Sequence, residues 1–263
     1  MSTVTSKDGT KIAYDKQGSG PAVILIDGAL CYRGFGPMPE LAKLLAPHFT
    51  VYTYDRRGRG ESSNGVPFSV EREVEDIDAL IQAAGNSAYL AGVSSGGALG
   101  LEAAIQLGDK VKKLAIYEAP YNSDPNSKGE WKTYTTKLLQ HLAEGRRGDA
   151  VELFMTFVGT PAEMISGMRQ SPMWGMFEAV APTLAYDTRD LGVEDRSVPV
   201  QRAATVKAKV LAMNGGAGFP FMKDTAEALS KAIPHAQHRI LEGQRHDVSN
   251  DILAPVLIEF FNS

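Results

Sequence analysis

The sequence predicts an α/β protein with a mostly parallel central sheet, flanking helices and a helical segment inserted between two strands. Short apolar or β-branched runs alternate with amphipathic segments at both ends of the chain, which is the pattern of parallel strands joined by crossover helices. From about residue 121 to residue 207 this alternation stops and only helical spacing remains. We therefore expect one core built from residues 1–120 and 208–263, with residues 121–207 as the insertion.

The elements of the N-terminal part of the core can be predicted in chain order. Two extended segments flank Asp8-Gly9, which is a hairpin signal, and the apolar run 22–26 is typical of a strand buried on both faces. The elements that follow are a helix over 41–46 ended by Pro47, a strand over 50–54, an amphipathic helix carrying Val70, Val74, Ile77 and Ile81, a strand over 88–91, a helix after Ser94 and a strand over 113–117.

The insertion and the C-terminal part complete the prediction. Helical spacing is found over residues 131–142, 150–158, 162–169 and 173–180, and the sheet pattern resumes with a strand over 210–213, a helix over 225–232, a strand over 238–241 and a last helix carrying Ile252, Val256 and Phe260. The insertion is rich in methionine and aromatic residues, most of which are expected to pack its own core. Trp174, Met176 and Phe177 are our candidates for side chains that line an apolar pocket.

Composition excludes several classes of function. The net charge of −4 gives no general attraction to nucleic acid or to an anionic membrane. Cys31 is the single cysteine, so no intrachain disulfide can form, which suits a reducing compartment. The N-terminal segment has no apolar signal core and no apolar run could span a membrane, so we expect a cytoplasmic protein. No metal-ligand spacing is present, and the glycine-rich loop 215–218 lacks the P-loop lysine, so neither a metal nor a cofactor is expected.

The stretch Gly92-Val93-Ser94-Ser95-Gly96 carries the main chemical signal. It lies between an apolar run and a helix-forming segment, so it reads as a strand, a sharp turn and a helix with a serine at the apex. Glycines are needed on both sides because the apex backbone is strained and the helix packs close to the strand. Ser94 is thereby placed to attack a carbonyl beside the free N–H groups of a helix N-terminus. The alternative is an ordinary glycine-rich turn.

Four motifs in this order resemble the α/β-hydrolase family over nearly the whole chain. Ile26-Asp27-Gly28-Ala29 occupies the place of the family's His-Gly oxyanion loop, and residues 55–62 resemble its D-x-R-G-x-G-x-S turn. Residues 92–96 resemble the nucleophile elbow, and Gly243-Gln244-Arg245-His246 follows the last strand, where the family places its catalytic histidine. The resemblance implies the α/β-hydrolase fold with the insertion as its lid.

A serine nucleophile needs a base near neutral pH, and histidine is the usual one. The chain has five histidines: His48, His141, His235, His238 and His246. Only His246 lies on a loop that follows a strand and a glycine, so it is the predicted base.

The third triad residue departs from the family's pattern. The usual aspartate would follow the strand over 210–213, but residues 214–220 contain no carboxylate. Glu118 directly follows the strand after the nucleophile helix, which is the alternative acid position in certain haloalkane dehalogenases and zearalenone-type lactone hydrolases. We therefore expect Glu118 to orient His246, with Asp224 as the second candidate.

Asp27 is expected to point away from the oxyanion site and to bond loop backbone, because its charge would oppose the oxyanion. Cys31 is expected to be buried filler.

These residues together predict a serine hydrolase that cleaves a carboxylic ester or a lactone. By the resemblance, the backbone N–H groups of Ala29 and Ser95 form the oxyanion hole, and the partner is a small, partly apolar molecule. Two alternatives remain open. One is a non-catalytic or weakly catalytic receptor on the same scaffold, and the other is a carbon–carbon bond hydrolase or lyase with the same triad.

Overall fold

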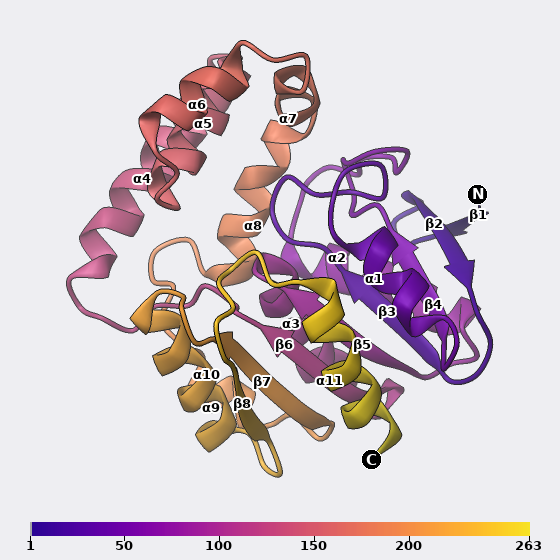
Figure 1. The fold of residues 1–263 in the computed structure, drawn as a ribbon. Helices are drawn as coiled ribbons and strands as arrows, with labels where there is room; N and C mark the ends of the chain where they lie inside the picture. The colour runs from indigo at the N-terminus through magenta and orange to yellow at the C-terminus, as the bar shows by residue number, and fades with distance from the viewer. Residues whose placement is uncertain (1) are drawn as a thin grey trace.

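Eight strands form one sheet in the part of the chain that the computed structural model describes, residues 2–263 (Figure 1). Their order across the sheet is β1-β2-β4-β3-β5-β6-β7-β8. Their bounds are β1 (Ser2–Thr5), β2 (Lys11–Gln17), β3 (Ala22–Ile26), β4 (Thr50–Tyr54), β5 (Ala88–Val93), β6 (Val111–Tyr117), β7 (Lys209–Gly215) and β8 (Gln237–Leu241). Only β1 and β2 run antiparallel to their neighbours, so the predicted hairpin and the predicted parallel sheet are both confirmed.

Both faces of the sheet are covered by helices, as the unbroken apolar run of β3 predicts. Val23 and Leu25 belong to one core cluster, together with the buried side chains of α1 (Met38–Leu45) and α11 (Asn250–Asn262). Ile24 and Ile26 belong to the other cluster, which includes the buried side chains of α2 (Val70–Ala83) and α3 (Ser95–Leu107). Alternate residues of the strand therefore face opposite layers.

The insertion between β6 and β7 is entirely helical. Its α-helices are α4 (Ser127–Ala143), α5 (Arg147–Phe157), α6 (Ala162–Arg169), α7 (Trp174–Val180), α8 (Leu184–Leu191) and α9 (Val200–Ala203), and α10 (Pro220–Ala232) follows β7. In Figure 1 helices α4 to α7 stand away from the sheet, while α8 descends from them to the core and α9 lies beside α10. The first four of these helices match the predicted segments.

Helix α8 was not predicted because its buried face is polar. Asp187, Thr188 and Asp190 are all buried, whereas sequence analysis looks for apolar residues at the buried positions of a helix. This helix packs against α2 and α3, so the end of the insertion is tied to the core by polar contacts. Among the described residues, no helix is both long and apolar enough to cross a bilayer.

Candidate active site

Ser94 occupies a strained turn at the end of β5. Its φ of 58° lies in the left-handed region that non-glycine residues rarely adopt, and its N–H donates to the Tyr117 carbonyl at 2.9 Å. Helix α3 begins at the next residue, Ser95. Strain of this kind costs about 1–3 kcal/mol and is found mainly at functional sites.

Packing explains the glycines on either side of Ser94. A Cβ on Gly92 would lie 2.3 Å from the Gly96 carbonyl oxygen, and a Cβ on Gly96 would lie 2.3 Å from the Ile26 carbonyl oxygen. Both distances are far inside van der Waals contact, and the obstacles are backbone atoms. The turn can therefore bring α3 against β3 and β5 only because these two positions lack side chains.

Glu118 lies beside Ser94 at the same edge of the sheet. Val93 and Tyr117 are partners in the parallel register of β5 and β6. The residues that follow them, Ser94 and Glu118, therefore leave the sheet side by side at the same edge. Glu118 also has a left-handed backbone, with a φ of 48°, and its N–H donates to the Met213 carbonyl at 3.0 Å. Its side chain is thereby turned toward the loop that follows β7.

His246 meets Glu118 in the structure. The Nδ1 atom of His246 lies 2.8 Å from Oε2 of Glu118, within the range of a charge-assisted hydrogen bond. The side chain of Glu118 is fully buried, while that of His246 is 42% exposed. Tyr117 supports the histidine loop, since its hydroxyl donates to the Arg245 carbonyl at 2.5 Å. Asp224, the second candidate for the acid, is exposed on α10.

The Glu118 carboxylate lies against the end of β7 and the glycine-rich loop that follows it, which contains no acidic residue. The N–H of Gly215 donates to Oε1 of Glu118 at 2.8 Å, and a Cβ on Gly218 would lie 2.8 Å from the same oxygen. The position where the family usually carries an aspartate is therefore occupied in space by the side chain of Glu118. The sequence signal for that substitution is the absence of a carboxylate from residues 214–220, where Gly218 leaves space for the Glu118 side chain.

The two predicted oxyanion donors lie beside Ser94. Ala29, Ser94, Ser95 and His246 all line one cavity. Within residues 2–263, neither Ala29 nor Ser95 donates its N–H to another backbone group outside a helix or strand ladder. A Cβ on Gly28 would lie 3.0 Å from Cβ of Ser94, so a larger residue there would crowd the nucleophile. The N-terminus of α3 adds its positive end to the same place.

The cavity beside Ser94 has a volume of about 1050 Å³. Helices α4 and α5 contribute five large apolar side chains to its wall, those of Trp131, Tyr134, Leu153, Phe154 and Phe157. A volume of this order accommodates a small organic molecule, and the wall is mainly apolar.

The predicted lining by Trp174, Met176 and Phe177 is not observed. None of the three is among the described residues that line the cavity. Trp174 and Phe177 are buried and pack edge-on against each other, and Phe177 packs edge-on against Phe35. Helix α7 thus uses its aromatic residues to hold the insertion together. The apolar spacing of α7 cannot distinguish this packing from exposure to a cavity.

Comparison with known proteins identifies the family of the chain. Residues 20–251 match the Alpha/beta hydrolase family. The chain belongs to this family. An alpha/beta hydrolase from Sphaerobacter thermophilus DSM 20745 is 46% identical, with a TM-score of 0.87, over 99% of this chain and 100% of that chain. The enol-lactonase from Burkholderia xenovorans LB400 is 19% identical, with a TM-score of 0.68, over all of both chains, which shows a shared fold alone.

A curated relative matches a shorter part of the sequence. The Uncharacterized hydrolase YraK of Bacillus subtilis is 34% identical over 117 residues, which is 42% of this chain and 41% of that protein. The present chain therefore spans about two fifths of the length of the curated relatives it matches. The substrate of this chain has to be inferred from its own site.

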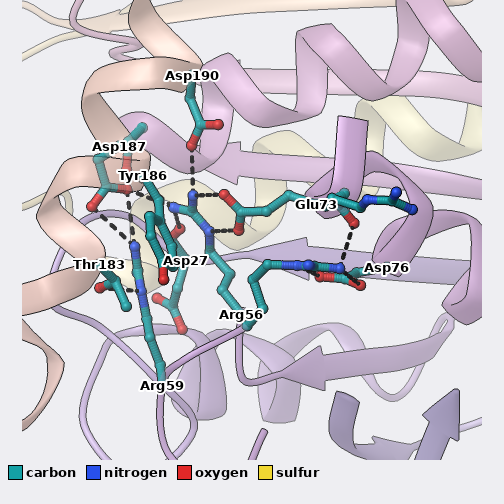
Figure 2. Close-up of polar contacts among 12 residues, drawn as sticks. Asp27, Arg56, Arg59, Glu73, Asp76, Thr183, Tyr186, Asp187 and Asp190 are labelled. Carbon is teal, nitrogen blue, oxygen red and sulfur yellow. Dashed lines mark hydrogen bonds and ion pairs between the residues drawn. The ribbon is translucent and has the colours of Figure 1, made fainter. Parts of the chain in front are cut away.

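A buried ionic cluster joins Asp187 and Asp190 of helix α8 to Arg56, Arg59 and Glu73 (Figure 2). Arg56 bonds both oxygens of Glu73 at 2.7 Å and also donates to Asp187 and Asp190 at 2.8 and 2.6 Å. Arg59 holds both oxygens of Asp187, at 2.9 and 3.0 Å. All five side chains are buried, so their charges can be accommodated only by one another.

The cluster contains three carboxylates and two guanidinium groups, which would leave one negative charge in excess. Burial, together with the charge of Glu73, raises the pKa of Asp190 well above its usual value. Its Oδ1 atom is buried without a hydrogen-bond partner in the described chain, which fits a protonated carboxyl. Burial also acts to raise the pKa of Asp187, but the charges of Arg59 and Arg56 hold it below its usual value.

Asp187 also contacts the residue after the nucleophile. The Ser95 hydroxyl donates to Oδ1 of Asp187 at 2.7 Å, and Arg56 donates to the same hydroxyl oxygen at 3.3 Å. Arg59 donates to the Gly28 carbonyl at 2.5 Å. The cluster therefore forms hydrogen bonds with both backbone segments that carry the predicted oxyanion donors, at Ser95 and at Gly28 beside Ala29. The sequence carries no local signal for this cluster, because Asp187 and Asp190 are ordinary acidic residues outside the predicted helices.

Asp27 differs from its expected role. Its side-chain Oδ1 is buried and has no hydrogen-bond partner among the described residues, so the predicted bond to loop backbone is wrong for this oxygen. Burial raises the pKa of Asp27 to about 7, against the opposing charges of Arg59 and Arg56. At pH 7 this carboxyl is therefore about half protonated, which reduces its average negative charge beside an oxyanion.

Two further groups complete the site. Cys31 lines the cavity and is partly buried, and burial raises the pKa of its thiol to about 12, so it stays protonated. No cluster of three or more metal-ligating side chains is found within residues 2–263.

Proposed function

We propose that this protein is a serine hydrolase that cleaves a carboxylic ester or a lactone through an acyl-enzyme on Ser94. The observation that carries the proposal is the contact between His246 Nδ1 and Glu118 Oε2 at 2.8 Å, beside a strained serine that shares a cavity with that histidine. A histidine held in this way presents Nε2 as a base, because its other nitrogen keeps the proton that it donates to the carboxylate.

The proposed reaction has two steps. Ser94 attacks the carbonyl carbon while His246 accepts the hydroxyl proton, and the N–H groups of Ala29 and Ser95 stabilise the oxyanion. The alkoxide leaving group takes that proton from His246. Water then attacks the acyl-enzyme with His246 again as base, which releases the acid and restores the serine.

The receptor alternative is less well supported. The buried carboxylate of Glu118 needs a partner, and the partner here is a histidine that lines the same cavity as Ser94. The contacts of Glu118 with His246 and Gly215 support the orientation that base catalysis needs.

Turnover of simple substrates tests the proposal. We expect hydrolysis of 4-nitrophenyl hexanoate or of a medium-ring lactone, and Ser94→Ala should reduce kcat by about 10⁴-fold or more. Ser95→Ala is the matched control, because it removes the neighbouring hydroxyl and leaves the backbone N–H in place. Equal activity of Ser94→Ala and the wild type would refute the proposal, as would the absence of turnover of every ester and lactone offered.

A further inference from the structure

Arg196 places a buried guanidinium group in the wall of the cavity that contains Ser94. Only 8% of this residue is exposed, and it lines the cavity. The rings of Trp131, Phe157 and Phe221 surround the guanidinium, with their centroids 5.1, 5.1 and 5.6 Å from its central carbon. The planar group is thus held in place by aromatic faces.

The N–H groups of Arg196 are largely unused. Its Nε has no hydrogen-bond partner within the described chain, and Nη1 makes one long contact with the Pro120 carbonyl at 3.5 Å. No carboxylate of residues 2–263 lies within ion-pair distance of it. In contrast, the other buried arginines, Arg56, Arg57 and Arg59, each hold at least one carboxylate.

This arrangement is unfavourable unless something else binds the charge. Arginine stays protonated in proteins, and removing its charge from water is costly without a hydrogen-bonded partner. Burial correspondingly lowers the pKa of Arg196, although the charge of Glu130 opposes that effect. Glu130 is exposed and makes no ion pair with Arg196 in the described chain, so it does not complete the group's hydrogen bonds.

The backbone around Arg196 is fixed beside the segment that follows β6 and contains Glu118. The Asn122 N–H donates to the Arg196 carbonyl at 2.8 Å, and the Val198 N–H donates to the Ser123 hydroxyl at 3.1 Å. The loop between α8 and α9 is thereby joined to the chain that leaves β6. Arg196 is therefore a preorganised part of the cavity wall.

We propose that Arg196 binds a carboxylate of the substrate, so that the substrate is an ester or lactone carrying a second, anionic group. The inference rests on the proposed function of Ser94 as the nucleophile. A guanidinium with free N–H groups in one plane matches a carboxylate in geometry and charge. The apolar wall formed by Leu153 and Phe154 accommodates a hydrocarbon segment between the two ends. Asp187, the buried acid of the cavity lining, is already neutralised by Arg56 and Arg59.

A matched pair of substrates tests this assignment. The 4-nitrophenyl monoester of adipic acid and 4-nitrophenyl hexanoate have the same reacting end and chain length and differ in the terminal carboxylate. We expect the wild type to prefer the acid ester in kcat/KM. Arg196→Met fills the space between the rings without charge and should reduce that preference at least tenfold, mainly through KM. Hexanoate turnover should fall by a smaller factor, so the ratio of kcat/KM for the two substrates isolates the loss of the carboxylate contact.

Two controls separate a bound carboxylate from general electrostatics and from folding. Arg196→Lys keeps the charge and should retain part of the preference. Lys132→Met removes an exposed cation on helix α4 that lies outside the cavity lining, and it should change the preference less than twofold. If Arg196→Met lowers both substrates equally, or if the wild type shows no preference for the acid ester, the assignment is wrong.

A binding measurement tests the carboxylate site without requiring Ser94 to react. Calorimetry with adipate and the Ser94→Ala protein should detect binding that Arg196→Met in the same background abolishes. Adipate binding without turnover of any ester would leave the carboxylate site standing and refute the hydrolase proposal. Ester turnover without adipate binding would refute the carboxylate site and leave the hydrolase proposal standing.

Discussion

Glu118 and His246 form a partly buried acid–base contact of 2.8 Å although they lie 128 positions apart in the sequence. The other carboxylate oxygen of Glu118 accepts the N–H of Gly215 at 2.8 Å. The glutamate therefore spans from the end of β6 to the loop after β7. The Glu118 side chain therefore brings a carboxylate within hydrogen-bond distance of His246, although its backbone follows β6 and not β7.

Glu118→Gln should preserve the fold but reduce kcat by about 10⁴-fold, because the amide can donate to His246 and favour the wrong tautomer. Steady-state turnover of 4-nitrophenyl hexanoate and a circular dichroism melt measure the two effects. Glu118→Asp is the matched control, since it keeps the charge and loses one methylene, and it should retain more activity than the glutamine variant. A loss below tenfold for Glu118→Gln would remove Glu118 from the triad and favour Asp224.

Asp187→Asn should lower the free energy of unfolding by about 3–5 kcal/mol, because it breaks a buried ionic network and leaves Arg59 with weaker partners. The measurement is urea denaturation followed by fluorescence. Ser95→Ala should cost only about 1 kcal/mol, since one hydrogen bond to Asp187 is lost while the ion pairs remain. Equal and small losses for the two variants would show that the cluster contributes little to stability.

Asp27 predicts a specific dependence of stability on pH. Its pKa is raised by burial from 3.8 to about 7, so the folded chain holds this proton more tightly than the unfolded chain. The contribution of Asp27 to stability is fully present below about pH 4 and decreases as the pH rises toward 7, by about 4 kcal/mol at most.

The comparison of Asp27→Asn with the wild type isolates this effect. The variant does not ionise, so its free energy of unfolding relative to the wild type should increase between pH 4 and pH 8. Urea denaturation at several pH values measures the difference. A difference that stays constant over this range would mean that Asp27 titrates near its ordinary value in the folded protein.

The cavity wall, and not α7, should set the preferred acyl length. Phe154 lines the cavity and is half-buried, so Phe154→Ala should shift the preference among 4-nitrophenyl esters toward longer acyl chains. Trp174→Ala should leave the preference unchanged and lower stability by about 3 kcal/mol or more, because its buried ring packs against Phe177. The reverse pattern would mean that α7 contacts the substrate.

The sequence predicts most of the fold because its signals are local. The apolar run of β3 and the glycines around Ser94 each impose a conformation within a few residues. The position of Glu118 could also be predicted, because parallel strands bring their carboxyl ends to one edge. In contrast, α8 was missed because its buried face carries Asp187 and Asp190, whose burial is possible only through Arg56 and Arg59, which lie some 130 residues earlier in the chain.

The site's walls could be predicted only in part for the same reason. Trp174 and Phe154 are both aromatic residues in helical segments, and periodicity alone cannot say which of two apolar surfaces a helix presents to a cavity. The importance of Arg196 also depends on contacts between distant segments. Its isolation from carboxylates becomes visible only when all of its neighbours are known.

Labelling with a fluorophosphonate tests the central claim, that Ser94 is an activated nucleophile, most directly. The probe reacts with a serine that a neighbouring base has activated, and it needs no knowledge of the natural substrate. We expect intact-mass analysis to show one adduct per chain and peptide mapping to place it on Ser94, with no adduct on Ser94→Ala and slow labelling of Glu118→Gln. An adduct on Ser95 or on another residue, or no adduct on the folded wild-type protein, would contradict the account.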